Sequence, residues 1–184
     1  MRMPLGLMVG ACSVTVLLGG GTKPALGDVN LELRPPTQTV RVGNTVNIGL
    51  YAVSDTGTDV PVGRIQAVLT WNASVLQLTG VVDNGPYVWL FSGFRDDSAD
   101  DGLNNTFVDG NALYEALAQF GGPAMATPSG LLVTTLQFTA LNTVSSSVVG
   151  IVAQIADTFS EVLDALPPIG VDVTGTLGSN QVTI

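Results

Sequence analysis

The sequence has no histidine, and its only cysteine, Cys12, and only lysine, Lys23, both precede Asp28. Residues 28–184 therefore lack imidazole, thiol and primary amine side chains, which excludes catalytic triads, histidine metal sites, Schiff bases and disulfides there. Paired carboxylates could still hydrolyse glycosides, but the few glutamates lie in no recognisable motif. We expect a protein that is not an enzyme and is stabilised by packing.

Positive charge is also scarce. From Asp28 onward, four arginines face fifteen acidic residues, which gives a net charge of −11. Such a surface repels nucleic acid and anionic membranes and favours solubility. We therefore expect no nucleic-acid partner.

The N-terminal residues have the layout of a secretory signal peptide. Arg2 gives a positive start, residues 3–18 are mostly apolar, and small residues precede the polar segment that begins at Asp28. This order predicts a signal peptide over residues 1–27, cleavage after Gly27, secretion, and one domain over residues 28–184.

Two alternatives fit this segment less well. A membrane anchor needs roughly 20 apolar residues, whereas this run is shorter and is broken by glycine and proline. The sequence ending at Cys12 loosely resembles a lipobox, but apolar residues continue beyond it, where a lipidated protein normally turns polar. We expect neither membrane insertion after cleavage nor a lipid on Cys12.

Most of the remaining chain alternates between apolar and polar residues, which is typical of strands with one buried face. In residues 64–71 the predicted buried set is Ile65, Ala67, Leu69 and Trp71. The same rhythm predicts three further buried sets: Val46, Ile48, Leu50 and Ala52; Leu132, Leu136 and Phe138; and Val149, Ile151, Ala153 and Ile155.

Glycine and proline turns separate these segments at fairly regular intervals. Many short strands joined by turns favour an all-β antiparallel sandwich or barrel of about nine strands. Residues 112–120 are ambiguous, because their composition favours helix while Tyr114, Ala116, Ala118 and Phe120 also alternate. Residues 158–164 fit either one helical turn or a loop.

Three segments together resemble cohesin domains, the modules that bind dockerins in bacterial polysaccharide-degrading assemblies. LTWNASVLQLTGVV (69–82) is similar to the family's joint between a strand ending in aromatic-Asp-Pro and the next strand. VRVGNTVNIGLYAV (40–53) is similar to its early Val-Gly-Asp-x-Val segment, and SGLLVTTLQFTAL (129–141) to its late Gly-x-Leu-x-Thr-Leu-x-Phe strand. The resemblance implies a jelly-roll β-sandwich of about nine antiparallel strands, in which residues 112–120 form a strand.

The resemblance also implies a function. It suggests a secreted, non-catalytic module that presents a sheet face to a protein partner of the dockerin type, in an extracellular polysaccharide-related assembly. In type I cohesins, polar residues that open the strand before the joint hydrogen-bond the dockerin, and the matching positions here are Arg64 and Gln66. The chain differs from the family at Asn72-Ala73, which replace Asp-Pro, and at Asn44, which replaces an Asp.

The joint also has a purely physical explanation. The side chains of Asn72 and Ser74 can bond the neighbouring backbone, reverse the chain, and return Trp71 and Leu76 to the core. Asn72-Ala73-Ser74 is a glycosylation sequon as well, but we favour the turn.

RDDSADDGLNNTFVDG (95–110) is the densest cluster of charge. Closely spaced Asp and Asn oxygens are ligands that Ca²⁺ prefers, but an EF-hand frame from Asp97 fails at Ala99 and Val108. A solvated loop is the favoured interpretation, so we expect no cofactor, with Ca²⁺ as the one alternative. The candidate calcium ligands are Asp97, Asp100, Asp101 and Asp109.

PYVWLFSGF (86–94) alternates so that Tyr87, Trp89 and Phe91 share one face. Three aromatic rings could form a platform for sugar stacking, but the opposite face is apolar too, which favours a strand buried on both sides. The alternatives to a protein-binding module are thus a carbohydrate-binding module, whose partner is a polysaccharide, and a structural cell-surface sandwich without a specific ligand.

Overall fold

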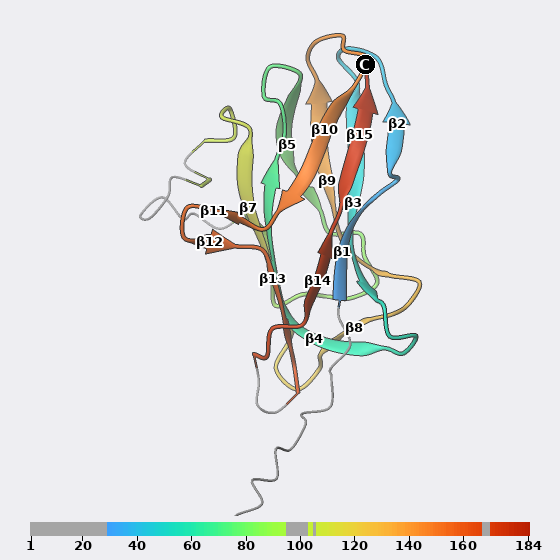
Figure 1. The fold of residues 1–184 in the computed structure, drawn as a ribbon, viewed down its shortest axis with the longest axis vertical. Helices are drawn as coiled ribbons and strands as arrows, with labels where there is room; N and C mark the ends of the chain where they lie inside the picture. The colour runs from blue at the N-terminus through green and yellow to red at the C-terminus, as the bar shows by residue number, and fades with distance from the viewer. Residues whose placement is uncertain (1–28, 95–102, 105, 167–169) are drawn as a thin grey trace, which may run out of the picture.

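The computed structural model describes residues 29–94, 103–104, 106–166 and 170–184. These residues form strands and turns only, and no helix among them is long and apolar enough to cross a membrane. Two sheets pack face to face as a β-sandwich (Figure 1). The predicted all-β sandwich is therefore confirmed, whereas the predicted signal peptide, with Cys12, lies outside the described residues.

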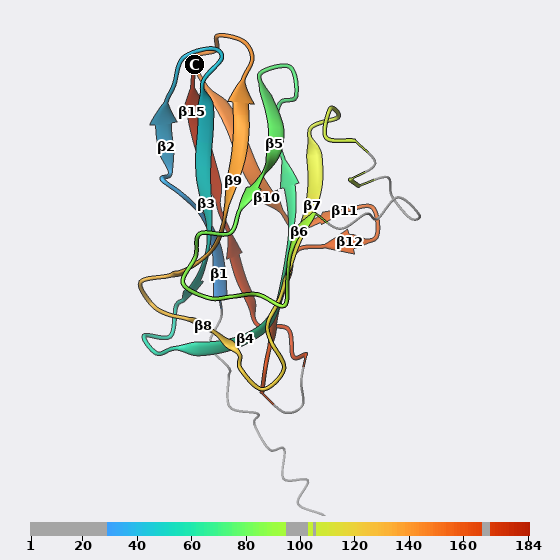
Figure 2. The same ribbon diagram turned by 180° about the vertical axis from the view of Figure 1, so that it is seen from behind.

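The five-stranded sheet is antiparallel apart from one edge (Figure 2). Its order is β14 (Thr174–Leu177), β1 (Val29–Arg34), β3 (Thr45–Ser54), β9 (Leu131–Ala140) and β5 (Leu76–Val82). β1 and β14 pair in parallel, so the first and the penultimate strand lie side by side.

The eight-stranded sheet is built around β4 (Val60–Thr70). Its other members are β2 (Thr37–Thr39), β15 (Ser179–Thr183), β10 (Ser147–Val152), β7 (Asn111–Leu117), β6 (Phe91–Phe94), β13 (Glu161–Asp164) and β8 (Ala124–Ala126). On one side of β4, β10 pairs with residues 68–70 and β13 with residues 62–66. Between them, β11 (Gln154–Ile155) and β12 (Thr158–Phe159) form a separate hairpin.

The core lies between the two sheets and is filled by alternate strand residues. All four residues predicted to be buried in residues 64–71 are buried, and so are the four predicted in residues 46–52. Trp71, at the end of β4, packs edge-on against Phe138 of the opposite sheet, with 5.4 Å between ring centroids. The period-two pattern thus identified the inner faces of β3 and β4 correctly.

Three residues predicted to be in the core lie elsewhere. Leu132 is only partly buried and faces outward, because the β3–β9 register shifts between Leu50 and Tyr51. Ala153 is exposed and Ile155 packs outside the sandwich, because β10 ends at Val152 and the chain leaves the sheet there.

The ambiguous segments are strands. Residues 112–120 contain most of β7, as the resemblance implied and helix propensity did not. Residues 158–164 contain β12 and β13, so the predicted helical turn or loop is wrong there. More segments are seen than the expected nine because long strands are interrupted: β10 and β13, for example, are two partners of β4 separated by the hairpin.

The joint between β4 and β5 is a side-chain-stabilised turn. The Asn72 Oδ1 atom accepts hydrogen bonds from the backbone N–H of Ser74 at 3.0 Å and from its hydroxyl at 2.7 Å. The backbone N–H groups of Val75 and Leu76 both donate to the Asn72 carbonyl. This geometry confirms the predicted turn chemistry of Asn72 and Ser74.

Candidate functional site

Arg64 and Gln66 lie on the outer face of the eight-stranded sheet, where they form part of a charge cluster. The Arg64 guanidinium donates from Nε to Glu115 Oε1 at 2.7 Å, from one terminal nitrogen to Glu161 Oε1 at 2.8 Å, and from the other to Gln66 Oε1. Glu115 comes from β7 and Glu161 from β13, which are the two neighbours of β4 at this level. The charge cluster, comprising Arg64, Gln66, Glu115 and Glu161, therefore ties three strands together.

The members of the charge cluster differ in their access to solvent. The side chains of Arg64 and Glu161 are 32% and 28% exposed, whereas that of Glu115 is 3% exposed. Gln66 is buried and also donates from Nε2 to the Phe159 carbonyl at 3.0 Å. Of the two predicted partner-binding residues, Arg64 alone offers substantial surface, and it is already engaged by two carboxylates.

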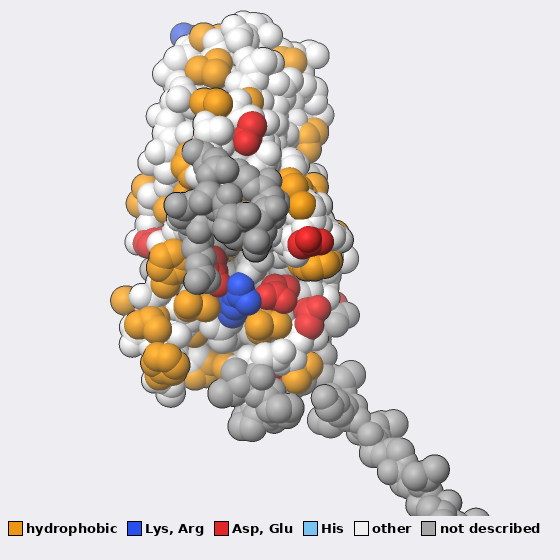
Figure 3. Space-filling view, turned by 90° about the vertical axis from the view of Figure 1, so that its left-hand side faces the viewer, with side chains coloured by type: hydrophobic (Ala, Val, Ile, Leu, Met, Phe, Trp, Pro, Cys, Tyr) orange, Lys and Arg blue, Asp and Glu red, His pale blue; other side chains and the backbone are white. Residues whose placement is uncertain are grey.

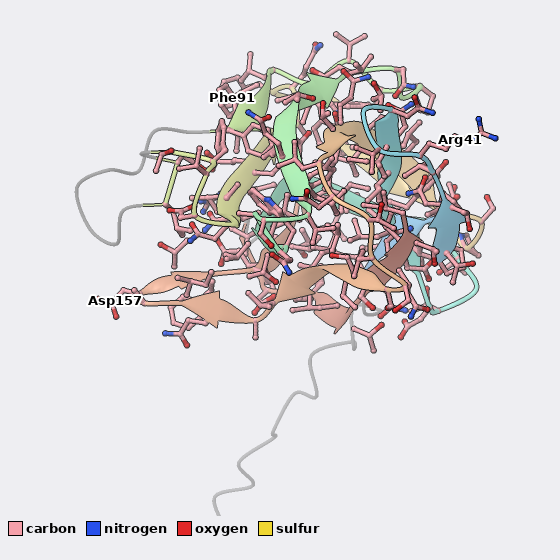
Figure 4. The ribbon with its side chains drawn as sticks, turned by 90° about the horizontal axis from the view of Figure 1, so that it is seen from above. Arg41, Phe91 and Asp157 are labelled. Carbon is pink, nitrogen blue, oxygen red and sulfur yellow. The ribbon has the colours of Figure 1, made fainter. Side chains whose placement is uncertain are left out.

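Above the charge cluster, toward the end that carries the C-terminus, the outer face is covered by the chain itself. Val68, Leu103 and Leu113 are buried together there, and Val152 and Ile155 pack against them. We call these five residues the outer apolar cluster. The adjoining β11–β12 hairpin projects from the sandwich, with Asp157 at its tip (Figure 4).

Two polar side chains complete the hydrogen bonding around the outer apolar cluster. Asn104 donates to the Leu113 carbonyl at 2.9 Å and accepts from the Leu113 N–H at 2.8 Å, just beyond the point where β6 stops pairing with β7. The Ser160 hydroxyl accepts from Val68 N–H at 2.9 Å and donates to the Val152 carbonyl at 2.6 Å, which bridges the break between β10 and β13. Asn104 and Ser160 therefore pair backbone groups of Leu113, Val68 and Val152 at places where the strand ladders are interrupted.

Below the charge cluster, the outer face opens into an apolar groove of about 430 Å³. Its lining includes Leu117 of β7 and Leu163 of β13, and Gly63 of β4 lies between those strands. Leu90, which precedes β6, also lines the groove. Its backbone N–H donates to the Leu117 carbonyl at 2.9 Å, which holds this segment against β7. Figure 3 shows the molecule from the left-hand side of Figure 1. On that face, an arginine patch (blue) is bordered by acidic (red) and hydrophobic (orange) side chains.

Phe120 stands at the rim of the apolar groove and is 95% exposed. It occupies the apex of a tight turn closed by the bridge between Gln119 and Gly122, in which Gly121 adopts a φ of +75°. Two neighbours on the adjoining segment, Val88 and Leu90, are also exposed. Contiguous exposed apolar surface of this kind marks an interaction site in a soluble protein.

The favoured interpretation of residues 86–94, a strand buried on both sides, is wrong, because residues 87–90 are not a strand and Val88 and Leu90 are exposed. The three aromatic residues of the alternative, a sugar platform, do not form one flat surface either. Tyr87 and Trp89 meet edge to face at 67°, and both precede β6, where the chain is not a strand. Trp89 is partly buried against the core and its Nε1 donates to the Val133 carbonyl at 3.1 Å. Phe91, in β6, is 38% exposed, so the exposed members of this segment are mainly the alternate residues Val88 and Leu90.

Of the candidate calcium ligands, only Asp109 lies within the described residues. It is exposed, and its Oδ1 atom accepts a hydrogen bond from the Asn111 N–H at 3.3 Å. No cluster of three metal-binding side chains occurs in the part of the chain that the structure describes. Asp97, Asp100 and Asp101 lie outside it, and the calcium hypothesis remains a prediction.

A second polar cluster runs from the buried Tyr114 and Thr134 to the exposed Asp83 at the surface of the sandwich. Tyr114 is fully buried, and its hydroxyl lies 2.6 Å from Ser92 Oγ, which donates to Asp83 Oδ1 at 2.7 Å. Thr134 donates to the same Asp83 oxygen at 2.9 Å. Burial raises the pKa of Tyr114 well above its usual value, so the phenol stays neutral and serves as a structural donor.

The apolar groove was missed by the sequence analysis. Leu117 and Leu163 are partly buried residues on the outward faces of β7 and β13, and the sequence pattern does not say which outward apolar residues meet across strands. Phe120 did carry a signal, since it directly precedes Gly121-Gly122-Pro123, a turn sequence that favours exposure. A large apolar residue at the apex of such a turn is a candidate contact residue.

Comparisons with known proteins find similar solved structures but no similar sequences. No protein-family model and no curated protein sequence matches the chain. Solved structures do match: a cohesin module of a family 33 glycoside hydrolase from Clostridium perfringens has a TM-score of 0.57 at 14% identity and covers 87% of this chain and 97% of its own. The solution structure of CaCohA2 from Clostridium acetobutylicum has a TM-score of 0.58 at 18% identity, and the match covers 86% of this chain and 91% of CaCohA2.

A third match is a type I cohesin–dockerin complex from Clostridium thermocellum, with a TM-score of 0.59 at 12% identity, covering 85% of this chain and 99% of the other. Type II cohesins from Acetivibrio cellulolyticus also match. The chain therefore has the cohesin fold, as its sequence resemblance suggested.

Proposed function

We propose that the chain is a non-catalytic, cohesin-like binding module that holds a protein partner of the dockerin type on the outer face of its eight-stranded sheet. The observation that carries this proposal is the exposed apolar groove beside the charge cluster on that face. The proposal is supported by the fold, since solved structures of the same fold include complexes with dockerins.

The site favours binding over catalysis. Arg64 and its carboxylates are satisfied by one another, and the groove beside them is lined mainly by apolar side chains, which supply contact area rather than reactive groups. The hydrogen-bonded charge cluster next to the apolar groove suits recognition of a protein surface.

The test is a titration of the full chain with a panel of type I and type II dockerin modules in calcium-containing buffer, followed by calorimetry. At least one dockerin should bind. Leu90→Arg places a bulky charge at the groove and should abolish binding, whereas Asn47→Arg, at an exposed position on the five-stranded sheet, should leave it intact. Failure of every dockerin to bind, or equal loss in both variants, would contradict the proposal.

We also propose that the protein is secreted and works in an extracellular polysaccharide-related assembly. Secretion rests on the signal-peptide layout of residues 1–27, and protein recovered from culture medium should begin at Asp28. Affinity capture from the same medium should recover a glycoside hydrolase that carries a dockerin. An intact N-terminus on the recovered protein would argue against cleavage, and capture without any dockerin-bearing protein would argue against this setting.

A further inference from the structure

The outer face of the eight-stranded sheet offers a partner only part of its length. Higher on the sheet, Val68 and Leu113 belong to the outer apolar cluster, and they are fully buried and 4% exposed, respectively. Three apolar side chains are exposed at the lower end, around the groove: Phe120 at 95%, Leu90 at 55% and Val88 at 74%. Val148 of β10 is also exposed, at 54%, but it lies away from the groove lining. The groove and the exposed side chains around it therefore offer apolar contact area to a partner.

The lining of the groove favours an aliphatic side chain from the partner. Leu90, Leu117 and Leu163 line it, and Gly63 presents backbone in place of a side chain. A leucine-sized side chain that enters this space would lose most of its contact with water, and burial of an apolar side chain favours binding. Its volume of about 430 Å³ holds more than one such group but is small for a folded element.

The charges beside the groove determine which sign of charge is favoured on the partner. Each guanidinium nitrogen of Arg64 already donates to a side chain of this face. Its two carboxylate partners outnumber it, so the cluster carries a net charge of −1, and Glu161 remains 28% exposed. The whole chain is strongly acidic, with a net charge of −9. A cationic group beside the groove is therefore attracted, and an anionic group is repelled.

From these observations we infer that the apolar groove is the anchor site of the proposed partner face, and that it takes a leucine or isoleucine side chain from a segment that carries lysine or arginine nearby. This inference rests on the proposed function for the location of the face. It adds the chemistry of the partner: an aliphatic anchor with a basic neighbour, seated against Phe120.

The experiment is a random-peptide display selection on the immobilised full chain. The selected peptides should carry leucine or isoleucine within about four positions of lysine or arginine, and replacing that basic residue with glutamate should weaken binding at least tenfold. Enrichment of acidic peptides, or no enrichment, would overturn the inference.

Three variants locate the binding site of the selected peptides. Phe120→Ser and Leu90→Ser remove exposed side chains of the groove and should each weaken binding by about tenfold or more. Val148→Ser is the matched control, because Val148 is 54% exposed on the same sheet but lies on β10, away from the groove lining. Equal affinity for all three variants and the native chain would place the site elsewhere and refute the inference.

The two proposals can fail separately. If no dockerin binds but basic aliphatic peptides bind at the groove, the class of partner is wrong while the anchor chemistry stands. If a dockerin binds and Phe120→Ser and Leu90→Ser do not weaken it, the class stands and the anchor site is refuted.

Discussion

Arg64 is the residue on which the outer face depends, because it neutralises a carboxylate that is almost fully buried. Replacing it with methionine keeps most of its apolar stem but leaves Glu115 without its cation. We expect Arg64→Met to lower the free energy of unfolding by about 2 kcal/mol, below the range for a fully buried pair because Arg64 is one-third exposed. Urea unfolding measures the change.

Two further variants check the cause of that loss. Arg41→Met alters an exposed arginine and should change stability by less than about 0.5 kcal/mol. Adding Glu115→Gln to Arg64→Met should restore part of the stability, since it removes the buried charge. A double variant that is still less stable than Arg64→Met would contradict this account.

The buried phenol of Tyr114 leads us to expect that the protein loses stability at alkaline pH. Its pKa is raised in the folded state by burial, so above about pH 10 the unfolded chain loses the phenol proton while the folded chain keeps it. Stability should therefore be retained below pH 10 and fall above it, by up to about 1.4 kcal/mol per pH unit for this one group. Urea unfolding between pH 8 and 11 should show this slope, and Tyr114→Phe should reduce it; an unchanged slope would rule out Tyr114 as the source.

At the scale of elements, Ser160 substitutes for the ladder hydrogen bonds that are missing between β10 and β13. Ser160→Ala would leave the buried Val68 N–H without this acceptor, and we expect a loss of about 2 kcal/mol in unfolding free energy. Ser145→Ala, at an exposed loop position, is the control and should be neutral. Equal stability of the two variants would show that the β10–β13 break needs no such bridge.

The elements also show how far the sequence could lead. Alternation identified the inner faces of β3 and β4, because burial against the opposite sheet acts on every second residue. It failed at Leu132 and Ala153, where a register shift and the exit of the chain from β10 depend on partners distant in sequence.

The candidate site was predicted only in part, for a related reason. Arg64 and Gln66 were placed correctly on an outward face, but their ties to Glu115 and Glu161 depend on which strands flank β4. The apolar groove likewise brings together residues from four separate segments of the chain. Strand order, which local sequence does not encode, was needed to assemble both.

At the scale of the whole molecule, the excess of negative charge should make stability depend on salt. The chain has a net charge of −9, and three ion pairs are seen in the residues that the structure describes. Raising NaCl from about 10 to 200 mM shortens the screening length from about 30 Å to below 8 Å, which weakens this self-repulsion. We expect the Tm to rise by a few degrees in calorimetry; a fall would mean that attractive pairs dominate.

The parallel pairing of the terminal strands has a mechanical consequence. β1 begins near the lower end and pairs with β14, β2 pairs with β15, and the C-terminus lies at the upper end (Figure 1). Tension applied to the chain at Val29 and Ile184 would slide these neighbours past one another along their length. Their backbone hydrogen bonds would then be loaded together rather than opened one at a time, so the fold is suited to carrying a pulling load along its long axis.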